Sequence, residues 1–188
     1  IIENVTGLNF SELIMTDIVL TQFQEKRISS IVNERNFGKP LGYILGQVNF
    51  YGLDIEVDDR VLIPRSETEQ VVEKAIEQLI MNQDKAQRVI DIGTGSGAIA
   101  LVIAANIENV EVLALDISNG SLDVAKHNYE NLKANLASGS KVIFQRSDCF
   151  NNVDREHLEK YDLIISNPPY IGEDEKETLE DSVKEYEP

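Results

Sequence analysis

Tryptophan is absent from this sequence, and its 188 residues include only one cysteine and two histidines. A single cysteine, Cys149, excludes an internal disulfide, and with only His127 and His157 beside it no zinc cluster can be assembled. We therefore expect no metal cofactor. We also expect Cys149 to be a small buried or half-buried apolar residue without a reactive role.

Long apolar runs are also absent: none approaches the roughly 20 residues that a membrane-spanning helix needs. The first residues, IIENVTGLNFSEL, are acidic and polar where a signal peptide would have a basic start and an apolar centre. These features predict a cytoplasmic protein without membrane contact, which we expect to be a monomer. A hydrophobic content of 42% is enough for one full domain with a small appendage.

Basic residues are scarce, with 17 Lys and Arg against 33 Asp and Glu, which gives a net charge of -16. Such a field repels a phosphate backbone unless a local basic patch overcomes it. Nucleic acid is therefore a disfavoured partner.

Apolar periodicity divides the chain into three parts. Residues 1–42 are expected to be a partial helical segment, because apolar residues recur there at three- and four-residue steps before the stop signal NFGKP. Residues 43–63 alternate in GQVNFYGLDIEVDD and predict a β-hairpin. Residues 64–188 form the third and largest part.

A helix is expected to open this third part at Ser66. The sequence SETE predicts a capping box, in which the Ser66 hydroxyl accepts from the amide of Glu69 and the Glu69 carboxylate reaches back. Its buried face should contain apolar side chains at helical spacing: Val71, Val72, Ala75, Ile76 and Leu79.

Short apolar runs then alternate with helical stretches from Arg88 onward. The runs RVIDIG, VEVLALDIS, KVIFQRSD and YDLIISNPPY are typical of parallel strands that are covered on both faces. We predict a doubly wound, Rossmann-like α/β sheet that is truncated after its fourth strand. The chain begins with Ile1 and stops at VKEYEP, so we expect it to be a fragment.

Ligands of open α/β sheets bind beyond the carboxyl ends of the strands, and three strand ends here suit an adenosine-bearing cofactor. The first carries DIGTGSGA, whose glycines permit a close approach of backbone to ligand, although this loop is also compatible with dinucleotide binding. Asp116 ends the second run, where its carboxylate can accept from ribose hydroxyls. At the third, Asp148 can accept from an exocyclic amine and Phe150 can pack on a purine.

The charge around the glycine loop selects among adenosine cofactors. No Lys or Arg lies beside it to hold phosphates, and Asp91 directly before it would repel them. A carboxylate favours a cationic ligand, such as the ammonium or sulfonium of S-adenosylmethionine. We therefore expect a methyl donor in this site.

The fourth run ends in Asn167-Pro168-Pro169-Tyr170. Prolines have no N–H, so this stretch offers carbonyl acceptors, and the Asn167 oxygen adds another. Together they can hold both hydrogens of an NH2 group while Tyr170 flanks a planar substrate. Holding the nitrogen in line with a methyl donor supplies catalysis by orientation, and we find no confident general base.

Several segments together resemble the HemK/PrmC family of N5-glutamine methyltransferases, which modify peptide chain release factors. They are KPLGYILG, FYGL, VLIPRSETE, DIGTGSGAIAL, LALDIS, SDCF, DLIISNPPYI and the terminal YEP. NPPY alone is shared with enzymes that methylate amino groups of DNA and RNA bases, whereas its combination with IPRSETE and YILG is more specific. The family usually has proline where this chain has Ser66.

The resemblance implies an S-adenosylmethionine-dependent enzyme that methylates the glutamine of a Gly-Gly-Gln motif in a release factor. It implies that the cofactor is held by Gly93, Thr94, Gly95, Ser96, Gly97, Asp116, Asp148 and Phe150, and we expect Asp91 and Asn167 to line the cofactor site as well. Asn167, Pro168, Pro169 and Tyr170 would hold the substrate amide, and Pro64, Arg65, Glu67 and Thr68 would lie near the methionine end of the cofactor. Two other interpretations stay open: methylation of a nucleobase amino group, and a cofactor-binding fragment without catalysis.

Overall fold

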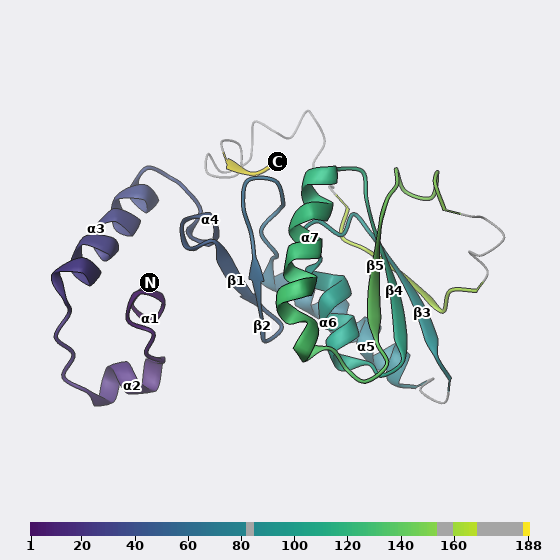
Figure 1. Cartoon of the computed structure of the whole chain (residues 1–188), viewed down its shortest axis with the longest axis horizontal. Helices are drawn as coiled ribbons and strands as arrows, with labels where there is room; N and C mark the ends of the chain where they lie inside the picture. The colour runs from purple at the N-terminus through teal and green to yellow at the C-terminus, as the bar shows by residue number, and fades with distance from the viewer. Residues whose placement is uncertain (82–84, 154–159, 169–185) are drawn as a thin grey trace.

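The computed structural model describes residues 1–81, 85–153, 160–168 and 186–188. Along the long axis of the molecule, Figure 1 shows the N-terminal helices, then a small hairpin, and then a layer of helices packed on a parallel sheet. In these residues no helix combines the length and the apolar character needed to cross a membrane. The division of the chain at residues 42 and 63 stays a prediction.

The N-terminal part is helical, as expected, but it consists of several short helices. They are α1 (Ile2–Thr6), α2 (Phe10–Met15), α3 (Gln22–Asn36) and α4 (Leu41–Leu45). Capping boxes open two of them, Asn9 with Glu12 at α2 and Thr21 with Gln24 at α3, where each side chain bonds the other's backbone amide. Beyond the last residue of α3, Gly38 takes a φ of 94° that suits glycine.

The hairpin consists of β1 (Gln47–Phe50) and β2 (Leu53–Glu56), paired antiparallel. Tyr51 and Gly52 both have positive φ, 49° and 82°, as a two-residue type I′ turn requires. Phe50 and Ile55 point into the core and are almost fully buried. The predicted hairpin is thus confirmed with its turn at the Tyr-Gly pair.

Helix α5 (Ser66–Ile80) begins where the sequence predicted, but the predicted capping box is wrong. Arg65 is the N-cap, and no side chain caps the helix. The Glu69 carboxylate instead accepts from the backbone amide of Tyr51 at 2.8 Å. Val71 was also placed wrongly on the buried face: it is 46% exposed, and Thr68 is buried in this helix instead.

Four parallel strands form the main sheet in the order β5-β4-β3-β6. They are β3 (Gln87–Ile92), β4 (Val110–Asp116), β5 (Lys141–Arg146) and β6 (Leu163–Ser166). Helix α6 (Ala98–Asn106) connects β3 to β4, and α7 (Asn119–Leu132) with a 3-10 turn (Lys133–Asn135) connects β4 to β5. The strands and helices thus alternate as predicted for an α/β methyltransferase-like sheet.

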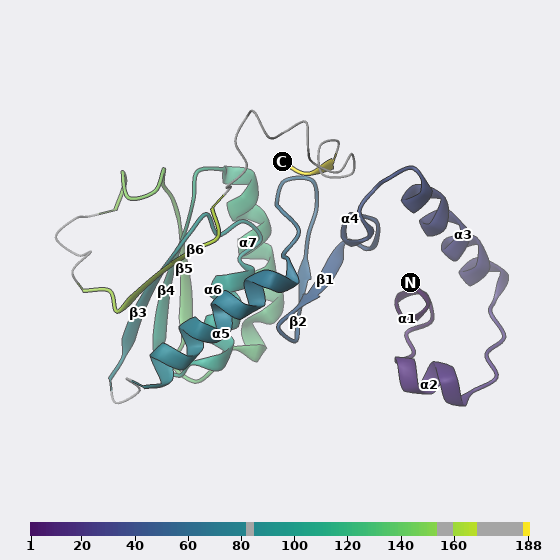
Figure 2. The same ribbon diagram turned by 180° about the vertical axis from the view of Figure 1, so that it is seen from behind.

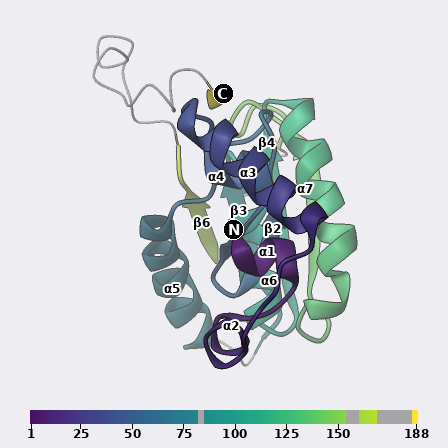
Figure 3. The same ribbon diagram turned by 90° about the vertical axis from the view of Figure 1, so that its left-hand side faces the viewer.

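The core lies between this sheet, the hairpin and helices α5, α6 and α7. Figure 3 shows α6 between α5 and α7, and Figure 2 shows α5 from the opposite side to Figure 1. The other face of the sheet has a smaller apolar cluster of Ile90, Leu113, Leu115 and Val153. Among the described residues no helix covers that face, so helical cover on both faces is not seen there.

Candidate functional site

The glycine loop after β3 is held by the end of β4. The amides of Gly93 and Thr94 both donate to the carbonyl of Leu115 at 2.9 Å, and the Gly95 amide donates to Asp116 Oδ2 at 2.9 Å. Asp116 Oδ1 accepts from the amide of Ser118, just before α7. One carboxylate thus joins the loop, the end of β4 and the start of α7.

The glycines of this loop have two different structural roles. Gly93, Gly95 and Gly97 all have positive φ, which L side chains rarely adopt. A Cβ on Gly93 or Gly95 would meet no atom within 4 Å, so the loop is open there to a ligand. A Cβ on Gly97 would lie 3.1 Å from the Cβ of Ala125, so this glycine allows close packing of α7 on the loop.

Asp91 lies beneath the loop with its side chain fully buried. Burial raises the pKa of its carboxyl to about 7; the Thr94 hydroxyl and the Ala100 backbone amide oppose this rise, and Asp116 adds to it. The Thr94 hydroxyl donates to Oδ2 at 2.7 Å, while Oδ1 has no hydrogen-bond partner among the described residues. A buried carboxyl with a free oxygen suits a cationic ligand group, which would stabilise its ionised form.

The end of β5 lies beside the end of β4, because the Ser147 amide donates to the Asp116 carbonyl at 2.9 Å. The next residue, Asp148, is exposed, and its carboxylate accepts from the Asn151 side chain at 3.2 Å. Phe150 is half-buried and packs against the smaller apolar cluster. Cys149 was expected to be buried or half-buried but is exposed, because it occupies a turn with φ 47°.

The end of β6 lies on the other side of the loop. Ser166 pairs with Ile92, and its hydroxyl donates to the Ile92 carbonyl at 2.8 Å. Gly93 directly follows β3 and Asn167 directly follows β6, so the two residues lie at the same edge of the sheet. The half-buried Asn167 donates from Nδ2 to the hydroxyl of Thr68, in the first turn of α5, at 3.3 Å.

The first turn of α5 also contacts the end of the chain. Arg65 donates from one guanidinium nitrogen to both carboxylate oxygens of Glu187, at 2.5 and 2.6 Å, and the Glu187 side chain is only 2% exposed. The Tyr43 hydroxyl, which donates to the Val61 carbonyl, lies nearby; burial foremost, and then Glu187, raises its pKa. The sequence elements IPRSETE and YEP thus meet in space.

The structure brings together most, but not all, of the residues predicted for the site. Asp91, the glycine loop and Asp116 are directly linked, and Asn167 is linked to Thr68. Pro64 is half-buried, Pro168 is exposed, and the exposed Glu67 carboxylate accepts from the Ser66 hydroxyl. Pro169 and Tyr170 lie outside the described residues, so their predicted roles are not tested.

One residue missed in the sequence is Asn128 in α7, which bonds the glycine loop at the carbonyl of Ser96. Its position offered a signal, because it follows Leu122 and Ala125 at helical spacing on the buried face of the helix. A polar residue on such a face requires buried hydrogen-bond partners. The contact between Arg65 and Glu187 was also missed, because no local pattern connects residues so far apart in the sequence.

A family model described as Methyltransferase small domain matches residues 69–184. The chain is 42% identical over 174 residues to a release factor glutamine methyltransferase of Streptococcus pneumoniae, covering 91% of this chain and 58% of that protein. It is 40% identical over 169 residues to one of Rhodopirellula baltica, covering 88% and 55%. These matches confirm the resemblance stated from the motifs.

The chain therefore spans a little more than half the length of these relatives. Among solved structures, the hMettl16 catalytic domain in complex with MAT2A 3'UTR hairpin 6 gives a TM-score of 0.50 at 22% identity. That match covers 68% of this chain and 42% of the other, and it supports the fold alone.

Proposed function

This chain belongs to the methyltransferase small domain family, and on that premise we propose that it transfers a methyl group from S-adenosylmethionine to the side-chain amide nitrogen of a glutamine in a peptide chain release factor. The observation that carries the proposal is the position of Asn167 at the end of β6. Hydrogen bonds from Ser166 to Ile92 and from Asn167 to Thr68 keep it beside the glycine loop. An amide-binding side chain thus lies next to a loop suited to the methyl donor.

Residues of three strand ends would hold S-adenosylmethionine. Asp116 would accept from the ribose, Asp148 and Phe150 would contact the adenine, and the open side of Gly93 and Gly95 leaves room for the ligand. Asp91 would balance the positive charge of the methionine part. When bound, the cofactor supplies the methyl group and leaves as S-adenosylhomocysteine.

Asn167 would recognise the nitrogen that receives the methyl group. Its Nδ2 faces Thr68, so Oδ1 is the atom left to accept from the substrate NH2. Pro168 adds a carbonyl acceptor without a competing N–H. An amide nitrogen becomes positive as it attacks, so oxygens fixed around it stabilise the transition state more than the ground state.

The remaining predicted residues keep the roles that the resemblance implies. Pro169 and Tyr170 would complete the clamp, and Pro64, Arg65 and Glu67 would lie near the methionine end of the cofactor and contact the substrate. Thr68 would act through Asn167. We also propose that the protein is a cytoplasmic monomer that uses no metal and binds neither membrane nor nucleic acid.

The test is a methyl-transfer assay with the full-length protein that contains this chain. Labelled S-adenosylmethionine is supplied with a purified release factor and with RNA in parallel reactions. We expect label on the glutamine of the release factor only. Label on RNA alone would favour nucleobase methylation, and binding of S-adenosylhomocysteine without any transfer would favour a cofactor-binding module.

A further inference from the structure

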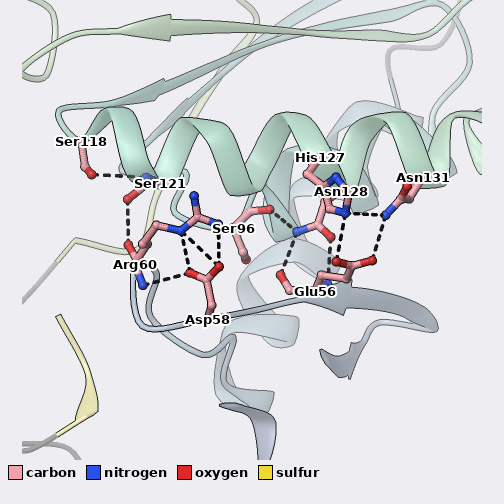
Figure 4. A network of polar contacts seen from close by, with 9 residues as sticks. All are labelled: Glu56, Asp58, Arg60, Ser96, Ser118, Ser121, His127, Asn128 and Asn131. Carbon is pink, nitrogen blue, oxygen red and sulfur yellow. Dashed lines mark hydrogen bonds and ion pairs between the residues drawn. The ribbon is translucent and has the colours of Figure 1, made fainter. Parts of the chain in front are cut away.

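Asn128 lies at the point where helix α7, the β1–β2 hairpin and the glycine loop meet (Figure 4). Its side chain is 1% exposed and makes three hydrogen bonds to backbone groups. Oδ1 accepts from the Glu56 amide at 2.8 Å, and Nδ2 donates to the Glu56 carbonyl and to the Ser96 carbonyl, both at 2.9 Å. These partners fix the orientation of the amide, because only oxygen can accept from an N–H and only nitrogen can donate to two carbonyls.

The Glu56 backbone is bonded through its N–H and its C=O, as it would be by a neighbouring strand. Asn128 therefore hydrogen-bonds the hairpin at Glu56 and the glycine loop at Ser96, and so connects both to α7. Losing this side chain would remove the bond to the buried Ser96 carbonyl and the two part-buried bonds to Glu56, which is costly.

Further contacts tie the same stretch of chain to α7. The Ser121 hydroxyl donates to the Arg60 carbonyl at 3.1 Å, and Asn131 donates to the Glu56 carboxylate at 2.9 Å. His127 also lies 3.1 Å from that carboxylate. The Asn131 and His127 contacts are exposed, whereas the Asn128 contacts are part-buried at Glu56 and buried at Ser96, and of these side chains Asn128 is the one that bonds the glycine loop.

We propose that Asn128 is a positioning residue that couples the hairpin to the cofactor loop, an inference that rests on the proposed cofactor site. The side chain does not touch the ligand. It holds the Ser96 carbonyl, and with it the Gly95 amide that faces Asp116. Because coupling between two sites is reciprocal, a ligand that orders the loop also stabilises the hairpin.

The test uses S-adenosylhomocysteine binding, measured by calorimetry on the full-length protein, and needs no substrate. Asn128→Ala removes all three hydrogen bonds and should weaken binding by about tenfold or more, because the loop must then be ordered when the ligand binds. The matched controls are Glu56→Ala and Asn131→Ala, which remove the exposed contacts and keep the Asn128 bonds. Both should bind within about twofold of wild type. A folded Asn128→Ala protein that binds within twofold would overturn the proposal.

Hydrogen exchange supplies a readout that mere loss of stability would not give. Adding S-adenosylhomocysteine to the wild type should slow exchange of the Glu56 amide by local coupling, with the Val112 amide in the sheet centre as the reference for global unfolding. In Asn128→Ala this protection should be lost while the Gly95 amide is still protected. If that variant does not fold, the wild type decides: no protection of Glu56 beyond that of Val112 overturns the proposal. A wild type that binds no S-adenosylhomocysteine overturns the proposed cofactor instead.

Discussion

The hydroxyl of Thr68 accepts a hydrogen bond from Asn167 Nδ2 at 3.3 Å, which joins the first turn of α5 to the end of β6. Thr68 is 8% exposed, and its turn is anchored by Arg65 on Glu187 and by Glu69 on the Tyr51 amide. The Nδ2 atom of Asn167 is therefore held by Thr68, and Oδ1 is left to accept from the proposed substrate. Thr68 has a positioning role in this account, and it does not contact the substrate.

Replacing Thr68 tests that role. Thr68→Val keeps the shape but removes the acceptor, so kcat should fall by about tenfold while the Kd for S-adenosylhomocysteine stays unchanged. Thr68→Ser retains the hydroxyl and should keep most of the activity. Steady-state kinetics on both variants make the comparison, and equal kcat values for them would contradict the role.

Asp116 should matter for cofactor affinity. Asp116→Ala removes both the proposed ribose acceptor and the carboxylate that holds the amides of Gly95 and Ser118. Charged hydrogen bonds of this kind are worth about 1.5–3 kcal/mol each, so we expect the Kd for S-adenosylhomocysteine to rise by at least about tenfold. The exposed Asp123 in α7 is the control, and Asp123→Ala should bind like the wild type. Calorimetry that finds equal affinity for the two variants would remove Asp116 from the site.

The titration of Asp91 makes a prediction about pH. Its carboxyl has a pKa of about 7 in the folded protein against 3.8 for an ordinary aspartate. The folded state therefore holds this proton more tightly, and its contribution to stability is fully present below about pH 4 and declines until about pH 7. In Asp91→Asn the free energy of unfolding, measured with urea between about pH 4 and pH 7, should not show this decline.

The same group should release a proton when the cationic cofactor binds. The positive charge lowers the Asp91 pKa, so at about pH 6.5 the binding enthalpy of S-adenosylmethionine should depend on the ionisation enthalpy of the buffer. Asp91→Asn should abolish that dependence. Calorimetry showing identical enthalpies in all buffers for the wild type would separate Asp91 from the cofactor's charge.

Gly97 should be the glycine of the loop that tolerates substitution least. Gly97→Ala introduces strain at φ 82° and places a Cβ 3.1 Å from Ala125. Gly46→Ala is a matched control, because it has φ 77° but no atom within 4 Å of the added Cβ. The strain alone costs about 1–2 kcal/mol, so Gly97→Ala should lower the free energy of unfolding by more than Gly46→Ala. If urea unfolding gives equal losses of unfolding free energy for the two variants, α7 moves to accommodate the added methyl group and the packing argument is wrong.

The strands and the glycine loop could be predicted from the sequence because their signals are local. A continuous apolar run such as VEVLALD and the turn residues Tyr51 and Gly52 each determine the conformation of their own segment. The position of Asp116 beside the glycine loop could also be predicted, because both follow parallel strands and the carboxyl ends of parallel strands share one edge.

The errors came from choices that tertiary contacts decide. The SETE motif satisfies the capping pattern, yet the Glu69 carboxylate finds the Tyr51 amide, 18 positions away in the sequence. Cys149 is exposed because the chain turns directly after β5, and that turn does not follow from the residue type. Asn128 and the pair of Arg65 with Glu187 depend on which elements pack together, and periodicity alone does not report this.

The central claim is that Asn167 binds the amide that receives the methyl group and contributes little to cofactor affinity. The most direct measurement compares wild type and Asn167→Ala in one preparation of the full-length protein, for methyl transfer to a release factor and for the Kd of S-adenosylhomocysteine. We predict a loss of kcat of about 10²-fold, as for other removed transition-state contacts, with the Kd unchanged within about twofold. A variant that keeps its kcat, or one that loses cofactor affinity as Asp116→Ala does, would contradict the account.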